Sequence, residues 1–187
     1  HTREVVHRDL KPENIAVGEF GEVIVLDWGL AKLLEETEQP TGDAPLGTLQ
    51  DAGQTIQGQI MGTPNYMPPE QARGNLNDVD VRCDVYSIGA TLYELITGTP
   101  PFSAASVYET IRQVINTEPT NPRDRNPDIG QDLATIVMKC LHKSPDKRYQ
   151  TAQELKAELE RFVDGHPILA RPISKAERLT RWCRRNP

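Results

Sequence analysis

The sequence is poor in cysteine and in aromatic residues, and it contains no long apolar segment. Its three cysteines are scattered and lie outside any C-x-x-C pair, which argues against a disulfide framework or a zinc site and favours reduced thiols in a cytoplasmic compartment. No apolar run is long enough to cross a bilayer, and no signal peptide is visible. The formal net charge of −6 argues against general nucleic-acid binding. The remaining composition, 37% hydrophobic and 26% charged, is that of an ordinary globular chain.

The most informative stretch is H-R-D-L-K-P-E-N at residues 7–14. Phosphoryl transfer from ATP needs a carboxylate near the attacking hydroxyl, a cation at the γ-phosphate and oxygen ligands for magnesium. Asp9, Lys11 and Asn14 could supply all but one of these groups. The stretch resembles the H-R-D-L-x-x-x-N catalytic loop of eukaryotic-type protein kinases, and its wording is similar to the serine/threonine branch. A charged turn after a helix is the alternative. The resemblance implies that Asp9 and Lys11 are catalytic and that Lys11, Glu13 and Asn14 bind the cofactors ATP and Mg²⁺.

Two short apolar runs, residues 15–17 and 23–26, flank a G-E-F-G turn and predict a β-hairpin. Such a hairpin would bring Asn14, which precedes the first run, next to Asp27, which follows the second. Oxygen donors placed in this way suit magnesium ions that carry nucleotide phosphates. We therefore expect Asn14 and Asp27 to be the metal ligands.

The triplet D-W-G at residues 27–29 resembles the D-F-G triplet of the kinases. Trp28 stands where the family has phenylalanine. The resemblance implies that its ring packs against His7, in a pocket wide enough for the larger indole.

Residues 33–55 are polar and contain several prolines and glycines, which predicts a mobile loop. By the resemblance this loop is the activation segment, and four threonines in it are candidate phosphorylation sites: Thr37, Thr41, Thr48 and Thr55. We favour Thr55 because of its distance before Gly62-Thr63, and the guanidinium of Arg8 suits a phosphate placed there. A solvated linker threonine is the alternative for each of them.

Residues 62–70, G-T-P-N-Y-M-P-P-E, resemble the end of the activation segment, with Pro68 in place of the usual alanine. The resemblance implies that Thr63 hydrogen-bonds the catalytic aspartate and lysine. It also implies a buried ion pair between Glu70 and Arg148, which we interpret as structural and not catalytic.

Apolar residues recur with helical spacing in four later stretches, and capping boxes open two of them. Asp84, near the start of the first stretch, either caps that helix or, by the resemblance, holds the backbone of the catalytic loop. We interpret residues 1–6 as the end of a helix that leads into the catalytic loop. The expected helices cover residues 83–97, 107–115, 133–141 and 152–162. A proline-rich connection covers residues 119–127.

These features predict a mainly α fold, the C-terminal (large) lobe of a protein kinase with a small β-hairpin. Residues 1–165 are assigned to this domain. No G-x-G-x-x-G or V-A-I-K occurs, so the N-terminal lobe that covers ATP is absent from the sequence. The first residue is His1, and we expect the chain to be a piece of a longer protein that contains the missing lobe.

We therefore expect a fragment of a bacterial, receptor-like serine/threonine protein kinase. The complete enzyme would transfer the γ-phosphate of ATP to serine or threonine hydroxyls of proteins, and the fragment alone would be inactive. A non-catalytic kinase-like binding or scaffold module and a small-molecule phosphotransferase are the alternatives. The joint presence of the catalytic and metal-binding residues favours an enzyme, and the constellation of Thr63, Glu70 and Arg148 favours protein substrates.

Residues 166–187 form a basic tail that contains Trp182. The cytoplasmic flanks of membrane helices favour this composition. We expect the parent protein to be anchored by a membrane span after Pro187, with this region on the cytoplasmic side.

Overall fold

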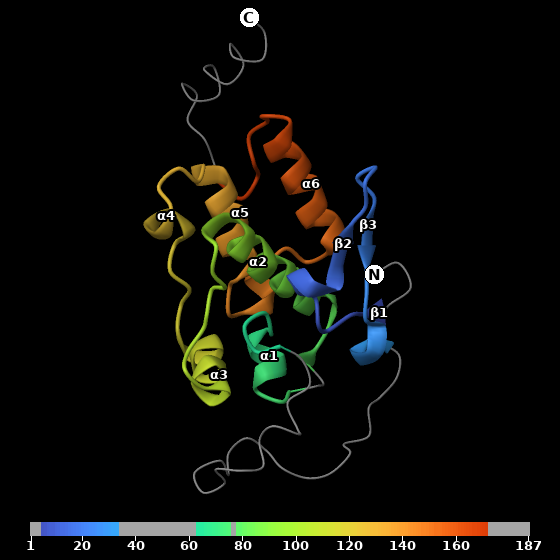
Figure 1. Ribbon diagram of the computed structural model, residues 1–187. Helices are drawn as coiled ribbons and strands as arrows, with labels where there is room; N and C mark the ends of the chain where they lie inside the picture. The colour runs from blue at the N-terminus through green and yellow to red at the C-terminus, as the bar shows by residue number, and fades with distance from the viewer. Residues whose placement is uncertain (1–4, 34–62, 76–77, 172–187) are drawn as a thin grey trace, which may run out of the picture.

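A computed structural model describes residues 5–33, 63–75 and 78–171 of the chain. Its architecture is mainly helical with a small hairpin, as expected (Figure 1). The four expected helices correspond to α2, α3, α5 and α6, whereas α1 and α4 are too short for a helical period to be visible in the sequence. The helical elements are α1 (Pro69–Ala72), α2 (Val81–Thr97), α3 (Val107–Asn116), α4 (Pro122–Arg125), α5 (Gln131–Cys140) and α6 (Ala152–Val163), with 3₁₀ turns η1 (Pro12–Asn14), η2 (Trp28–Leu30) and η6 (Pro145–Lys147).

The strands of the described residues form two separate antiparallel pairs. Strands β2 and β3 pair with Ile15 opposite Val25, which is the expected hairpin. Strands β1 and β4 pair with Val5 opposite Leu33. The expected helix end at residues 1–6 is therefore wrong at its last two positions, because these β-branched valines are extended and pair with a later segment. The strands are β1 (Val5–Val6), β2 (Ile15–Val17), β3 (Val23–Val25) and β4 (Lys32–Leu33).

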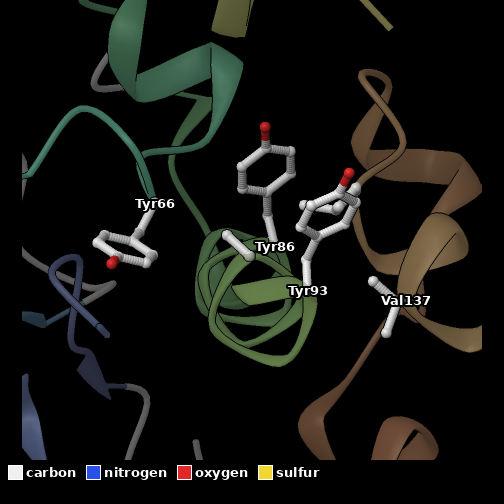
Figure 2. Close-up of a cluster of buried hydrophobic side chains, with 6 residues drawn as sticks. Tyr66, Tyr86, Tyr93 and Val137 are labelled. Carbon is white, nitrogen blue, oxygen red and sulfur yellow. The ribbon is translucent and has the colours of Figure 1, made fainter. Parts of the chain in front are cut away.

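Helix α2 lies at the centre of the molecule, with α5 and α6 on one side and α1 and α3 on the other (Figure 1). Figure 2 shows that Tyr86 and Tyr93 of α2 pack with Tyr66, from the segment before α1, and with Val137 of α5. Three of these four side chains have no exposed area. Helix α2 therefore packs between α5 and the segment before α1, which lies beside the catalytic loop.

Side-chain caps fix where the long helices begin. Asp80 caps α2, and Ser106 and Thr151 cap α3 and α6 by accepting a hydrogen bond from the N–H three residues later. Ser106 and Thr151 thus begin the two helices for which the sequence predicts a capping box. Helix α2 ends at Gly98, whose φ of 77° is the left-handed conformation that glycine adopts without strain.

Residues 166–171, which we call the strap, continue the packed structure past the end of α6. Ile168 is 3% exposed and joins the core between α2, α5 and α6. Glu158, a buried carboxylate of α6, accepts a hydrogen bond from the strap backbone, and Arg171 forms a 2.7 Å ion pair with Asp132 of α5. The packed structure therefore extends past residue 165, where the predicted domain ends. Among the helices of the described ranges, none is long and apolar enough to span a membrane.

Candidate active site

Helix α2 holds the backbone of the catalytic loop, residues 7–14. The two carboxylate oxygens of Asp84 accept hydrogen bonds from the backbone N–H groups of His7, at 2.9 Å, and Arg8, at 3.0 Å. Burial raises the pKa of the Asp84 carboxyl, and the two N–H groups oppose that shift. Asp84 therefore contacts the catalytic loop, and the residue that caps α2 is Asp80 instead.

The carboxylate of Asp9 is held by three neighbours. Its Oδ1 accepts a hydrogen bond from the backbone N–H of Thr63 at 3.0 Å, and its Oδ2 lies 3.0 Å from Lys11 Nζ. The side chain of Asn14 donates from Nδ2 to the same Oδ2 at 3.4 Å. Lys11 Nζ also donates to Thr63 Oγ1 at 2.7 Å, so Thr63 contacts both predicted catalytic residues. At 10% exposure, the Asp9 side chain keeps a fixed orientation and is still reachable from outside.

The hairpin brings Asn14 and Asp27 to one end. The N–H of Leu26 donates to the backbone oxygen of Asn14 at 2.8 Å, so Asp27 follows directly beside it. The Asn14 side chain also donates from Nδ2 to the backbone oxygen of Asp9 at 2.9 Å, which leaves Oδ1 as its ligand atom. Asp27 is exposed and left-handed, with φ 56°, and its carboxylate accepts a hydrogen bond from Gly29 N.

An amide oxygen and an exposed carboxylate are ligand types that Mg²⁺ accepts, so this pair fits the ion implied by the sequence. In the described part of the chain, no group of three or more His, Cys, Asp or Glu side chains could hold a metal. A magnesium ion at Asn14 and Asp27 would therefore need further oxygen ligands, which nucleotide phosphates and water provide.

The rings of His7 and Trp28 meet edge to face, with centroids 4.8 Å apart, which is the contact that the resemblance implies. His7 Nδ1 accepts a hydrogen bond from the N–H of Asp9, so we assign the ring proton to Nε2, which lies 2.9 Å from the carbonyl oxygen of Leu26. The indole N–H of Trp28 donates a hydrogen bond to the backbone carbonyl oxygen of Val25 at 3.0 Å. His7 therefore connects the catalytic loop to the end of the hairpin.

Glu70 and Arg148 form the buried ion pair implied by the sequence. Two parallel hydrogen bonds, Nη1 to Oε1 at 2.7 Å and Nη2 to Oε2 at 2.8 Å, join them, and their side chains are 5% and 0% exposed. The thiol of Cys83 donates to the same carboxylate at 3.1 Å, and burial raises the pKa of that thiol. This cluster fixes α1 against α2, directly after the segment that contains Thr63.

One contact near the site has no counterpart in the sequence predictions. The hydroxyl of Tyr66 donates to the carboxylate of Glu94 in α2. Burial and this hydrogen bond raise the pKa of Tyr66, and the nearby charge of Glu13 adds to the effect. Glu13 itself is exposed in η1. Only the position of Tyr66 inside the activation-segment motif draws attention to it, and no local pattern indicates Glu94 as its partner.

Two predicted features lie outside the described residues: the activation-segment threonines, including Thr55, and the tail from residue 172 to residue 187. Arg8, the predicted phosphate-binding residue, is described. Its Nε donates to the carbonyl oxygen of Leu30 at 2.6 Å, which links the catalytic loop to η2.

Comparison with known proteins agrees with this geometry. The protein kinase domain profile matches residues 1–159. The chain is 38% identical over 179 residues to serine/threonine-protein kinase PknB of Mycolicibacterium smegmatis, an alignment that covers 95% of the chain and 26% of that protein. It is 38% identical over 168 residues to a probable serine/threonine-protein kinase of Streptomyces coelicolor, covering 90% and 23%. It is 36% identical over 169 residues to serine/threonine-protein kinase PknD of Protochlamydia amoebophila, covering 88% and 17%.

The chain spans about a quarter or less of the length of these curated relatives. The profile nevertheless covers the catalytic loop, the hairpin, helices α1 to α5 and part of α6. The chain belongs to the protein kinase domain family.

Proposed function

We propose that this chain is the catalytic and substrate-docking part of an ATP-dependent serine/threonine protein kinase. The observation that carries the proposal is the arrangement around Asp9, whose carboxylate contacts both Thr63 N–H and Lys11 Nζ at 3.0 Å. A base, a cation and the end of the activation segment thereby meet at one point. The relatives are named as serine/threonine-protein kinases, which favours protein serine/threonine phosphorylation over a small-molecule phosphotransferase or a scaffold module.

In this proposal the hydroxyl oxygen of a serine or threonine attacks the γ-phosphorus of ATP, and Asp9 accepts the hydroxyl proton. The bond between the γ-phosphorus and the bridging oxygen breaks, and ADP leaves. Lys11 offsets negative charge on the transferred phosphoryl group, and its contacts with Asp9 and Thr63 keep its ammonium at the site. Bound Mg²⁺, held by Asn14 and Asp27, would neutralise charge on the nucleotide phosphates. Fixed positions matter because phosphoryl transfer depends on positioning and electrostatic stabilisation.

The outer surface of the hairpin supports a further part of this proposal, the partner lobe. Val17 and Val23, which pair on one face of the hairpin, are 70% and 64% exposed, and Trp28 of the neighbouring turn η2 is 55% exposed, so apolar side chains beside the site are open to solvent. We infer that a preceding lobe of the parent protein covers this surface and completes the ATP site, with Glu13 and Lys11 on its floor. A parent protein whose preceding segment lacks a phosphate-binding glycine-rich loop would contradict this.

Two regulatory features are proposed from the sequence. Phosphorylation of Thr55 would order the activation segment through Arg8, which lies directly before Asp9, and phosphopeptide mapping of the active parent protein tests this. The basic tail would place the domain on the cytoplasmic side of a membrane, and the partition of the parent protein between membrane and soluble fractions tests that.

The central experiment compares two aspartates in the parent protein. Asp9→Asn should lower kcat by about 10²–10⁴-fold with nucleotide affinity nearly kept, because it removes the proton acceptor. Asp27→Asn should instead weaken the binding of magnesium–ATP, because it removes a metal ligand. Asp128→Asn, at an exposed position between α4 and α5, is the matched control and should leave both quantities unchanged. Near-normal turnover of the Asp9→Asn protein would refute the catalytic assignment.

A further inference from the structure

We propose that Gln71 is a positioning residue for Asp9, and that its side-chain amide holds the peptide group that leads into the catalytic aspartate. Gln71 Nε2 in α1 donates to the backbone oxygen of Arg8 at 3.2 Å, across 63 residues of sequence. The kinetic part of this inference rests on the proposed function. The structural part does not, because it concerns the backbone of the catalytic loop.

The backbone of Arg8 is in a conformation that needs support. Its φ of 68° is left-handed, a region that a residue with a Cβ atom rarely adopts. Such a conformation persists only where the surrounding structure holds it. Asp84 binds the N–H of Arg8, Leu30 accepts from its Nε, and Gln71 binds its carbonyl oxygen. Gln71 therefore contacts Arg8 at the end that leads into Asp9.

The carbonyl of Arg8 and the N–H of Asp9 belong to one planar peptide group. Gln71 holds the oxygen of this group, and His7 Nδ1 accepts from its N–H at 3.3 Å. The orientation of this plane sets the direction in which the Cα–Cβ bond of Asp9 leaves the loop. A rotation of the plane would turn the carboxylate away from the N–H of Thr63, which lies 3.0 Å from it.

Gln71 can fix the plane because its own helix is rigid. Its neighbour Glu70 is tied by two hydrogen bonds to Arg148, and its other neighbour, Ala72, is 3% exposed in a core with Met67. The buried ion pair therefore acts on the active site through Gln71. Breaking the pair would loosen α1, and a loosened α1 would no longer hold the Arg8 carbonyl in place.

The test uses Gln71→Met in the parent protein, because methionine keeps the length and the helix propensity of glutamine and removes the donor. Hydrogen exchange of the segment 7–11 should become about 10-fold faster, and kcat should fall about 10-fold with KM for ATP within about twofold. Gln153→Met, at an exposed position of α6, is the matched control and should change neither.

A second variant, Gln71→Glu, decides the question if Gln71→Met does not fold. Its carboxylate cannot donate at neutral pH, so kcat should fall at least as far as in Gln71→Met. The loss relative to the unaltered protein should shrink as pH falls toward the glutamate pKa, because the protonated carboxyl can donate. If Gln71 only stabilised the fold, the recovery would follow the fraction of folded protein, and kcat per folded molecule would not change with pH relative to the unaltered protein.

Exchange and kcat that both match those of Gln153→Met would overturn the inference, as would faster exchange with unchanged kcat. A parent protein without phosphorylation activity in any form would instead refute the proposed function, and the exchange measurement, which needs no turnover, would still decide whether Gln71 holds the backbone of the catalytic loop.

Discussion

The helical core and the β2–β3 hairpin hold their parts of the site in different ways. The helices α1 and α2 and the segment before α1 fix Asp9 through polar contacts, from Asp84 and Gln71 to the loop backbone and from Thr63 to the carboxylate. The hairpin holds Asp27 on a pair of three-residue strands. A two-stranded pair is marginally stable by itself in water. The proposed base is thus built into the core, and the proposed metal ligand depends on a much weaker element.

In the described part of the chain, the links between the two regions come from the catalytic loop. The backbone oxygen of Asn14 accepts from Leu26 N–H, and His7 contacts both the Leu26 carbonyl and the ring of Trp28. These contacts come from His7 and Asn14, which also hydrogen-bond Asp9, so a displacement of the hairpin would reach Asp27 directly and Asp9 only through these two residues. We therefore expect changes in the core to affect folding and changes on the hairpin surface to leave it intact.

The largest effect is expected where a charge in the core loses its partner. Arg148→Met should lower the free energy of unfolding by about 3–5 kcal/mol, because Glu70 would remain buried without its counter-ion. For a chain of this size the melting temperature should fall on the order of 10 °C, measured by circular dichroism.

Lys156→Met is the control for Arg148→Met, because Lys156 and Glu160 form an exposed pair at 3.5 Å in α6. That change should shift the melting temperature by no more than about 1 °C. The double variant Glu70→Leu/Arg148→Met should recover part of the loss. A single variant no less stable than the control would show that the pair does not hold α1.

A smaller effect should come from Lys143, which joins the α5–η6 connection to α3. Burial lowers its pKa from 10.5 to about 8, although its ammonium donates to Val114 O at 2.6 Å and lies 4.0 Å from the Phe102 ring. Between pH 8 and 10.5 the unfolded chain binds more protons at Lys143 than the folded chain does. The contribution of Lys143 to the free energy of unfolding therefore rises with pH in this window and is lost as pH falls through about 8.

Lys143→Met should therefore flatten the pH dependence of stability between about pH 8 and 10.5, by about 1 kcal/mol at most because the side chain is only half-buried. The measurement is denaturant unfolding of both proteins at several pH values in that window. Parallel curves for the two proteins would contradict the assignment of this pH dependence to Lys143.

The smallest effect is expected on the hairpin surface. Ile24→Thr keeps a β-branched residue at a position that is 52% exposed, so the melting temperature should change by no more than about 1 °C. Ile136→Thr makes the same chemical change at a position in α5 with no exposed area, and it should cost about 2–4 kcal/mol. Equal losses in the two proteins would show that the hairpin packs as tightly as the core and would remove the contrast.

Local patterns explain which parts of this fold could be predicted from sequence. The hairpin follows from two apolar runs around a glycine turn, and α2 and α6 follow from apolar spacing and capping residues. The pairing of Val5 with Leu33 could not be predicted, because two-residue strands have no measurable alternation. The contacts of Tyr66 with Glu94 and of Gln71 with Arg8 are single polar pairs between distant segments. No spacing rule connects such residues, and only the folded chain shows them together.

The strap has a mechanical consequence. Ile168, the Glu158 contact and the ion pair of Arg171 with Asp132 fasten it to α5 and α6 at three separate points. A pull on the chain beyond Arg171 would load these fastenings before any force reached the catalytic loop. Tension would enter the molecule at α5 and α6, on the side of α2 away from α1 (Figure 1). The strap therefore gives the C-terminal end of the described chain an anchorage that is separate from the contacts that hold Asp9.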